Sequence, residues 1–285
     1  MNSVMSMAVQ AINAQAMAIS NISDNVANSS TVGYKAVQTQ FLDLVQGMQS
    51  TSSPVLGGSK QMGVTAYADF LNRGQGQIVS DSSTSSAAIS GNGFFPVAKP
   101  TGVDPETGEP TGFESTVYYT RQGDFHLDSS GRLVNAAGYY LMAAPASGTG
   151  TPQIYTVDAD DNAAGGSFTG VSITDGGAIT VSYDDGSTSV QGQILLANFA
   201  EPDSLDRVDG TAFLATEESG RAVYGNPVSH SNGVGSIVGS ALEQSTADTA
   251  DQMTKLIIAQ QAYSMNSQVI QAANEMMTTA LGMKG

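Results

Sequence analysis

The residues that could catalyse a reaction are few and scattered along the chain. The sequence contains two histidines, His126 and His230, and no cysteine. His126 lies in an alternating stretch typical of a strand, and His230 lies in a segment rich in Ser, Asn and Gly. Neither histidine has a sequence neighbour that would complete a catalytic triad or a metal pair. We therefore expect both histidines to be structural or solvated.

One acidic stretch has part of the spacing of a calcium-binding loop. It contains Asp158, Asp160, Asp161 and Asn162. An EF-hand loop needs Gly at its sixth position and Glu at its twelfth, where this chain has Ala163 and Thr169. The EF-hand interpretation therefore fails, and a looser cation site near residues 158–162 stays open. The sequence has no nucleophile elbow, Walker loop or HExxH motif, so we predict a protein that is not an enzyme and needs no cofactor.

The amino-acid composition argues against several classes of binding partner. The 285 residues include 26 acidic and 10 basic side chains, which gives a formal net charge of −16. So few basic residues argue against binding to nucleic acid or to an anionic membrane surface. No apolar run reaches membrane-spanning length, so we expect no membrane insertion. Residues 1–7 lack a basic region followed by an apolar block, and we therefore expect no cleaved signal peptide.

The last stretch of the chain has the period of a long helix. Leu256, Tyr263, Ile270 and Met277 recur every seven residues. Two further rows accompany them: Ala259, Asn266, Ala273 and Ala280, and Ala262, Val269, Met276 and Met283. The rows predict a helix with one broad apolar stripe, as in a coiled coil or bundle. The alternative is a long helix that packs only on its own domain.

The N-terminus repeats this pattern. Met5, Ile12, Ile19 and Val26 are also seven residues apart, and no charged residue precedes Asp24. A solvated helix normally carries charges on its outer face, so we expect neighbours to cover this helix on most sides. We predict that the two sets of four residues, Met5 to Val26 and Leu256 to Met277, form an assembly interface.

The two ends enclose a segment of different character. Residues 46–62 are predicted to be a linker or extended arm, because they are rich in Ser, Thr and Gly. Period-two alternation and turn residues predict a β-rich body over 63–235, with a short variable insert at 146–190. The predicted fold is α+β. Helices within 1–45 and 236–285 pair as a coiled-coil domain, and a mainly antiparallel β body lies between them.

The segment after the first helix carries a motif. Asn25, Val26, Ala27 and Asn28 are followed by Thr31, Gly33, Tyr34 and Lys35. This run resembles the signature of the bacterial flagellar rod, hook and filament-junction family. Similar blocks follow in the same order at 89–97, 118–141 and 193–199, and the resemblance covers about 1–145 and 190–285. We expect Gly33 to adopt a positive φ that a side chain would strain.

The resemblance implies a structural subunit of the flagellar hook, the curved tube that links rod to filament and transmits torque. Its implied partners are other copies of the chain, the distal rod, hook cap and hook–filament junction proteins, and the type III export apparatus. It implies a location in the flagellum, outside the cell. The short insert favours the alternative of a rod protein, whereas Ile22, Ser23 and Asp24 favour the hook. A secreted β-rich hydrolase or carbohydrate-binding protein is the alternative from another class.

Overall fold

The computed structural model describes residues 2–46, 60–104, 109–146, 150–158, 166–209, 211–229 and 231–283. The chain divides into two compact units. The first, which we call the helical unit, comprises Met1–Ser29, Ala36–Leu71 and Ala247–Gly285. The second, the β body, comprises Ser30–Lys35 and Asn72–Thr246. Each unit therefore draws on segments that are far apart in the sequence.

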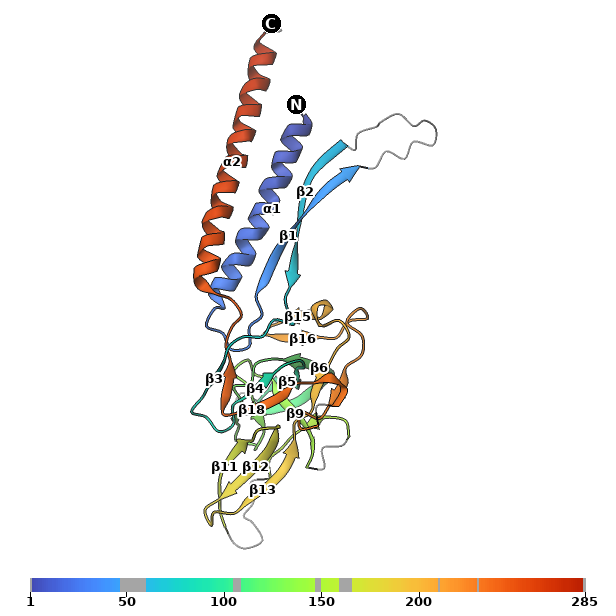
Figure 1. The fold of residues 1–285 in the computed structure, drawn as a ribbon, viewed down its shortest axis with the longest axis vertical. Coiled ribbons are helices and arrows are strands. Elements are labelled where there is room, and N and C mark those ends of the chain that lie inside the picture. Colours follow the sequence, from blue (N-terminus) through green and yellow to red (C-terminus); the bar gives the residue numbers. More distant parts are fainter. Residues whose placement is uncertain are drawn as a thin grey trace, which may run out of the picture. The chain divides into compact units, whose positions relative to one another are not determined.

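The helical unit contains two helices and a β-hairpin. Helices α1 (Asn2–Ala27) and α2 (Thr249–Gly282) lie side by side, and strands β1 (Val37–Gln46) and β2 (Lys60–Phe70) lie along α1 (Figure 1). The two strands pair antiparallel, from Val37 opposite Phe70 to Gln46 opposite Lys60. Among the described residues, neither helix is both long and apolar enough to cross a membrane.

Asp248, the residue just before α2, caps the start of the helix. The Asp248 carboxylate accepts hydrogen bonds from the backbone N–H groups of Ala250 (2.8 Å) and Asp251 (3.5 Å). An aspartate in this position satisfies N–H groups that have no partner inside the helix, and its charge suits the positive end of the helix dipole.

The element boundaries differ from those expected within 1–45, 46–62 and 236–285. Helix α1 ends at Ala27, and β1 then contributes to the hairpin. Strand β2 begins at Lys60, inside the segment expected to be a linker, while residues 47–59 lie outside the described residues. The two strands are separated by thirteen residues without a short turn motif, so local turn chemistry gave no signal for their pairing. Residues 236–243 form strands of the β body rather than the start of α2.

The β body is built from short antiparallel strands. Within the described residues, eleven strands join one sheet whose main path runs β11-β12-β13-β9-β5-β6-β16-β15, and β14-β17, β18-β4 and β19-β3 form separate pairs. The strands are β3 (Ile78–Ser80), β4 (Ala87–Ser90), β5 (Phe95–Val103), β6 (Pro110–Thr120), β7 (His126–Leu127), β8 (Leu133–Val134), β9 (Tyr140–Pro145), β10 (Gln153–Ile154), β11 (Phe168–Ile173), β12 (Ala178–Tyr183), β13 (Thr188–Gln193), β14 (Leu196–Asn198), β15 (Asp206–Val208), β16 (Ala212–Leu214), β17 (Val223–Gly225), β18 (Ser236–Gly239) and β19 (Ala241–Glu243). Short 3-10 helices lie at Pro202–Ser204 and Ser231–Gly233.

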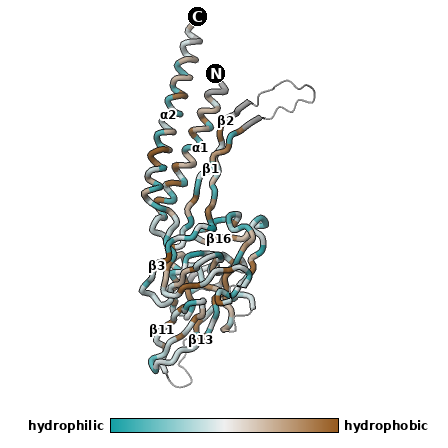
Figure 2. The backbone as a smooth tube through the Cα atoms, viewed as in Figure 1, coloured by the Kyte–Doolittle hydropathy of each residue, from teal (hydrophilic) through white to brown (hydrophobic). Residues whose placement is uncertain are grey.

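The core of the β body has two clusters of buried side chains. The larger includes Phe95, Phe125, Leu141 and Ile179. In the smaller, the ring of Phe94 meets those of Phe199 and Phe213 edge to face, a geometry that the charge distribution of aromatic rings favours. Apolar residues also run along both helices and β1, outside this core (Figure 2). The predicted α+β class, with terminal helices and a mainly antiparallel β body, is confirmed.

Candidate functional site

The exposed residues of α1 form a single narrow line. Between Met5 and Ala27 its exposed positions alternate in steps of three and four, apart from Asp24 next to the line. They are Ser6, Val9, Asn13, Ala16, Ser20, Ser23 and Ala27, which we call the small line of α1. The rest of the helix surface is buried or half-buried within the helical unit. This explains why a helix so poor in charge needs no solvated charged face.

Helix α2 buries a different row from the one that its large residues suggested. Gln252, Ala259 and Ala273 are buried, and Asn266 between them is half-buried. The row begins where the Asn25 amide donates to the Gln252 side-chain oxygen over 3.2 Å, which connects α1 to α2. Small residues in this row allow the two helices to approach closely.

The predicted interface residues lie beside these buried rows. Met5, Ile12, Ile19 and Val26 on α1 are half-buried, as are Leu256, Ile270 and Met277 on α2. Tyr263 is 41% exposed. Each residue therefore keeps surface that no part of the described chain covers, and its role in an assembly interface stays a prediction.

A second apolar row on α2 is much more exposed. It consists of Ile258, Ala262, Met265, Val269, Ala272, Met276, Thr279 and Met283, which alternate in steps of four and three, and we call it the outer stripe of α2. Ile258, Met265, Val269 and Met276 are 61%, 60%, 45% and 57% exposed. The sequence had placed part of this row within one broad stripe. The structure shows that the outer stripe is distinct from the buried row of α2, because α1 covers only that row of small residues.

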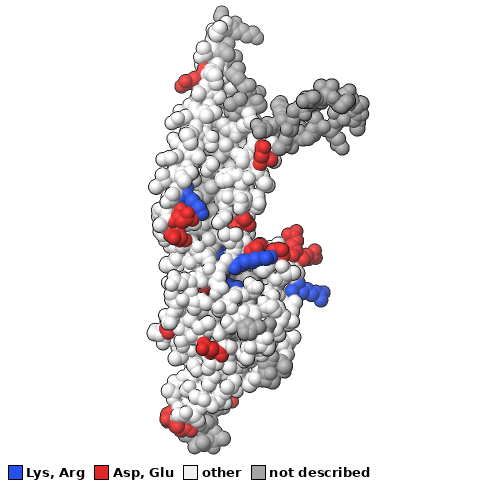
Figure 3. All heavy atoms as spheres, viewed as in Figure 1, with Lys and Arg blue, Asp and Glu red and all other residues white. Residues whose placement is uncertain are grey.

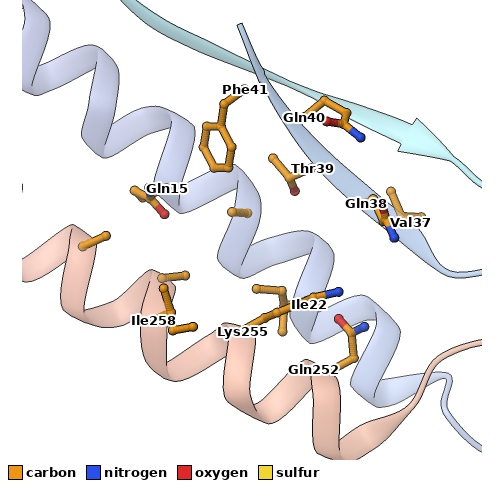
Figure 4. Close-up of a pocket in the computed structure, with 13 residues that line it drawn as sticks. Gln15, Ile22, Val37, Gln38, Thr39, Gln40, Phe41, Gln252, Lys255 and Ile258 are labelled. Atoms are coloured by element: carbon orange, nitrogen blue, oxygen red, sulfur yellow. The ribbon is translucent and has the colours of Figure 1, made fainter.

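The outer stripe begins at the edge of a groove in the helical unit. The groove, about 340 Å³ in volume, lies between α1, α2 and β1. Figure 4 shows Ile258 and Lys255 on one side of it, Ile22 at its base, and Phe41 and Thr39 on the strand. Phe41 is 46% exposed. The groove is lined mainly by apolar side chains and amides, so it suits another apolar protein segment better than a charged ligand.

Asn25, the first residue of the family-like motif, fastens α1 to the hairpin. Its buried amide donates to the carbonyl oxygen of Val37 (2.7 Å) and accepts from the Val37 N–H (2.9 Å). Asn28 then donates to the Asp24 carbonyl (2.9 Å) at the end of the helix, and Ala27 is exposed on the small line. The half-buried Thr31 accepts a turn hydrogen bond through its carbonyl from the Tyr34 N–H (3.3 Å).

The motif continues in the β body, where Gly33 lies against other backbone. Gly33 has the expected positive φ, 69°, and a Cβ atom there would come within 2.7 Å of the Arg121 carbonyl carbon. Its N–H donates to the Glu243 carbonyl (2.8 Å), and the Thr246 N–H donates to the Tyr34 carbonyl (3.1 Å). A glycine is therefore required for both conformation and space.

Lys35 closes the motif in a buried charge cluster. Its ammonium pairs with the Glu243 carboxylate and donates to the Gly74 carbonyl (2.6 Å). The Glu243 carboxylate also accepts from the Gly76 N–H (2.8 Å) and from the Arg121 guanidinium (3.3 Å). Burial lowers the pKa of Lys35 to about 8, although Glu243 opposes the shift, and burial also lowers the pKa of Arg121. One carboxylate thus joins four separate segments of the β body.

The described residues contain no group of three or more His, Cys, Asp and Glu side chains arranged to hold a metal ion. His126 is exposed on β7, while His230 and residues 159–162 lie outside the described residues. The charged side chains seen on one face are dispersed (Figure 3). In the β body, Arg73 pairs with Glu201 and Asp203.

Comparison with known proteins identifies the family. Three family models match: "Flagella basal body rod protein" at residues 5–35, "Flagellar hook protein FlgE/F/G D1 domain" at 88–181, and "Flagellar basal body rod FlgEFG protein C-terminal" at 238–283. The flagellar basal-body rod protein FlgG of Caulobacter vibrioides is 32% identical over 93% of this chain and 92% of its own length. The chain belongs to the flagellar hook and rod family.

Other family members agree with this assignment. The flagellar hook protein FlgE of Brucella abortus is 28% identical over 97% of both chains. A crystal structure of the Helicobacter pylori hook protein FlgE2 matches 73% of this chain and 43% of that one, with 14% identity and a TM-score of 0.24, too low to support an argument. The protein is a structural subunit of the flagellar hook or rod. The family is structural, so the hydrolase or carbohydrate-binding alternative is not retained.

Proposed function

We propose that this hook and rod family member polymerises with copies of itself into the tube of the flagellar hook. The observation that carries the proposal is the outer stripe of α2, in which four large apolar residues are about half exposed. Together they form an exposed apolar patch along α2, and large exposed apolar patches on soluble proteins mark interaction sites. A second protein surface that covers the stripe removes this patch from water.

The arrangement of the two helices supports assembly through the helical unit. The buried row of α2 repeats every seven residues, from Gln252 through Ala259 to Ala273, which is the period of a coiled coil, and we propose that α1 and α2 pack in this way. The half-buried rows predicted to form the interface, Met5 to Val26 and Leu256 to Met277, then border the contact with neighbouring copies. In an assembled tube these residues and the outer stripe would be covered together.

The rod is the second candidate, and one observation favours it. The alignment with the Brucella hook protein extends over 407 positions although this chain has 285 residues, so that relative has many additional residues. The alignment with the Caulobacter rod protein needs only 275 positions. A rod subunit of this length therefore fits without a missing segment.

The other expected properties follow from membership of an axial flagellar structure. We propose that the distal rod, hook cap and hook–filament junction proteins are neighbours of the polymer, and that the type III apparatus exports the chain without cleavage of a signal peptide. The assembled protein would then be extracellular. The chain is proposed to need no cofactor for this role and to bind no nucleic acid.

A matched pair of variants tests polymerisation. Met265→Glu with Val269→Glu places two charges on the outer stripe, where burial of unpaired carboxylates is costly. Ser264→Glu with Gln268→Glu places the same charges one residue earlier, at exposed positions outside the stripe. We expect the wild type and the second variant to form tubes at high concentration in electron microscopy and sedimentation, and the first variant to remain monomeric. Tubes from both variants, or none from the wild type, would refute self-assembly through this face.

Genetic replacement separates hook from rod. The gene is deleted in its own bacterium, and isolated basal bodies are imaged by electron microscopy. Complete rods without hooks support the hook assignment, whereas truncated rods establish the second candidate. Intact hooks and rods would contradict both.

A further inference from the structure

Two helical faces of the helical unit are largely exposed to solvent among the described residues. One is the small line of α1, and the other is the outer stripe of α2. They lie on different helices and are separate from the buried rows through which α1 and α2 contact each other. Each is therefore available to a second protein surface while the helical unit stays intact.

The two faces match in period and length. Both alternate in steps of three and four, the repeat that keeps two helices in register along a shared seam. The small line runs from Ser6 to Ala27 and the outer stripe from Ile258 to Met283. At 1.5 Å per residue these are about 32 and 38 Å long. A helix is thus the element whose shape fits either face.

The two faces are also complementary in side-chain size. The small line consists of Ser, Ala, Asn and one Val, and therefore leaves shallow spaces between its side chains. The outer stripe supplies long or branched side chains at Ile258, Met265, Val269 and Met276. Close packing of helices requires large residues to face small ones. The members of both faces are uncharged, with the exposed Asp24 beside the small line and the exposed Lys255 and Glu275 beside the outer stripe.

A tube also needs two different faces. If the outer stripe paired with the outer stripe of another copy, the contact would use the same surface on both subunits and would close as a dimer. A contact between unlike faces leaves one of each face open at the ends, so that further subunits can add. The small line and the outer stripe supply such a pair.

We propose that the outer stripe of α2 in one subunit packs against the small line of α1 in a second copy. This inference rests on the proposed polymerisation and identifies the seam that carries it. Methionine suits the seam because its flexible side chain repacks when neighbouring subunits shift. The half-buried rows on both helices then flank the seam on either side.

Single cysteines test the pairing, because the natural chain has none. One preparation carries Met265→Cys, and others carry Val9→Cys, Ala16→Cys or Ser23→Cys on the small line. Each is polymerised alone or mixed with the Met265→Cys subunits, treated with a short bis-maleimide, and examined on a denaturing gel. We expect a product of twice the subunit mass in at least one mixture and in none of the separate preparations. Ser264→Cys, exposed beside Met265 but outside the stripe, is the control and should give no product in any mixture.

The outcomes distinguish this inference from the proposed function. A product from Met265→Cys alone would show stripe-to-stripe contact, and a product from an α1 variant alone would show contact between small lines. Tubes that give no product in any mixture would also overturn the proposed seam, yet would leave polymerisation established. If the wild type forms no tubes under any condition, polymerisation itself fails.

Discussion

Lys35 shows how a buried charge can be tolerated at a crossing of distant segments. The three donors that reach Glu243 come from parts of the chain more than forty residues apart. Burying these charges costs desolvation free energy, so the cluster adds little net stability. It instead favours one arrangement of the segments that it joins. The charge cluster therefore specifies where the chain enters and leaves the β body.

The lowered pKa of Lys35 predicts an unusual dependence of stability on pH. Lys35 has a pKa of about 8 in the folded protein and the ordinary lysine pKa of 10.5 in the unfolded chain. Between these values the unfolded chain binds more protons, so the free energy of unfolding rises with pH. We expect a gain of about 1–2 kcal/mol from pH 8 to 9.5. Urea unfolding followed by near-ultraviolet circular dichroism of the tyrosines measures it.

Lys35→Met is the control for this measurement. In that variant Glu243 keeps Arg121 and the Gly76 N–H as partners, so the carboxylate is not left alone. The rise between pH 8 and 9.5 should disappear. An equal rise in both proteins would show that another group titrates.

At the scale of single residues, the sequence predicted backbone conformation better than it predicted contacts between residues. Gly33 was expected to need a positive φ, because glycine is the residue that adopts it without strain. Glu243, in contrast, lies in the segment 236–285 that was expected to hold the last helix, and it is instead a buried strand residue. Its partner Lys35 is 208 residues away in the sequence, and no local pattern encodes a contact over that distance.

At the scale of elements, helix α2 separates two apolar rows that look alike in sequence. Period alone identified both, because a helix repeats every 3.6 residues whatever covers it. Which row is buried depends on the close approach of α1, which only small residues permit. The hairpin of β1 and β2 was missed because thirteen residues separate its strands in the sequence, so no two-residue turn motif signals their pairing.

The buried row of small residues on α2 predicts that the same substitution changes stability by different amounts at two alanines. Ala259→Leu adds volume where α1 and α2 meet, and overpacking of this kind costs about 1–3 kcal/mol. Ala272→Leu adds the same side chain to the exposed outer stripe and should change the stability of the monomer by less than about 0.5 kcal/mol. Thermal melting followed by the helical signal at 222 nm, in dilute protein, compares them. Equal melting temperatures would indicate that Ala259 does not lie in a close contact.

At the scale of the whole molecule, the division into two units predicts that assembly and folding of the β body can be separated. Leu256→Glu with Ile270→Glu places charges beside the contact of α2 with α1, where they meet neighbouring copies in the proposed tube. Neither residue belongs to the β body. We expect a soluble protein that forms no tubes, with the unfolding transition of the β body retained in circular dichroism.

Gln260→Glu with Asn274→Glu is the matched control. These residues are also fourteen apart and exposed on α2, but they lie outside both apolar rows. This variant should still form tubes. Loss of the β-body transition in the Leu256 and Ile270 variant would favour the alternative in which the helix packs on its own domain.

The position of Glu243 in the sequence also determines when the β body can complete its fold. Strands β18 and β19 complete the pairs with β4 and β3, and the Glu243 carboxylate neutralises Lys35 and Arg121. A chain that emerges with its N-terminus first lacks these groups until residue 243 of 285 has appeared. Until then Lys35 and Arg121 could be buried only without their counterion, at a cost of several kcal/mol. If the proposed export delivers the N-terminus first, the β body would therefore reach its final structure only after Glu243 has emerged.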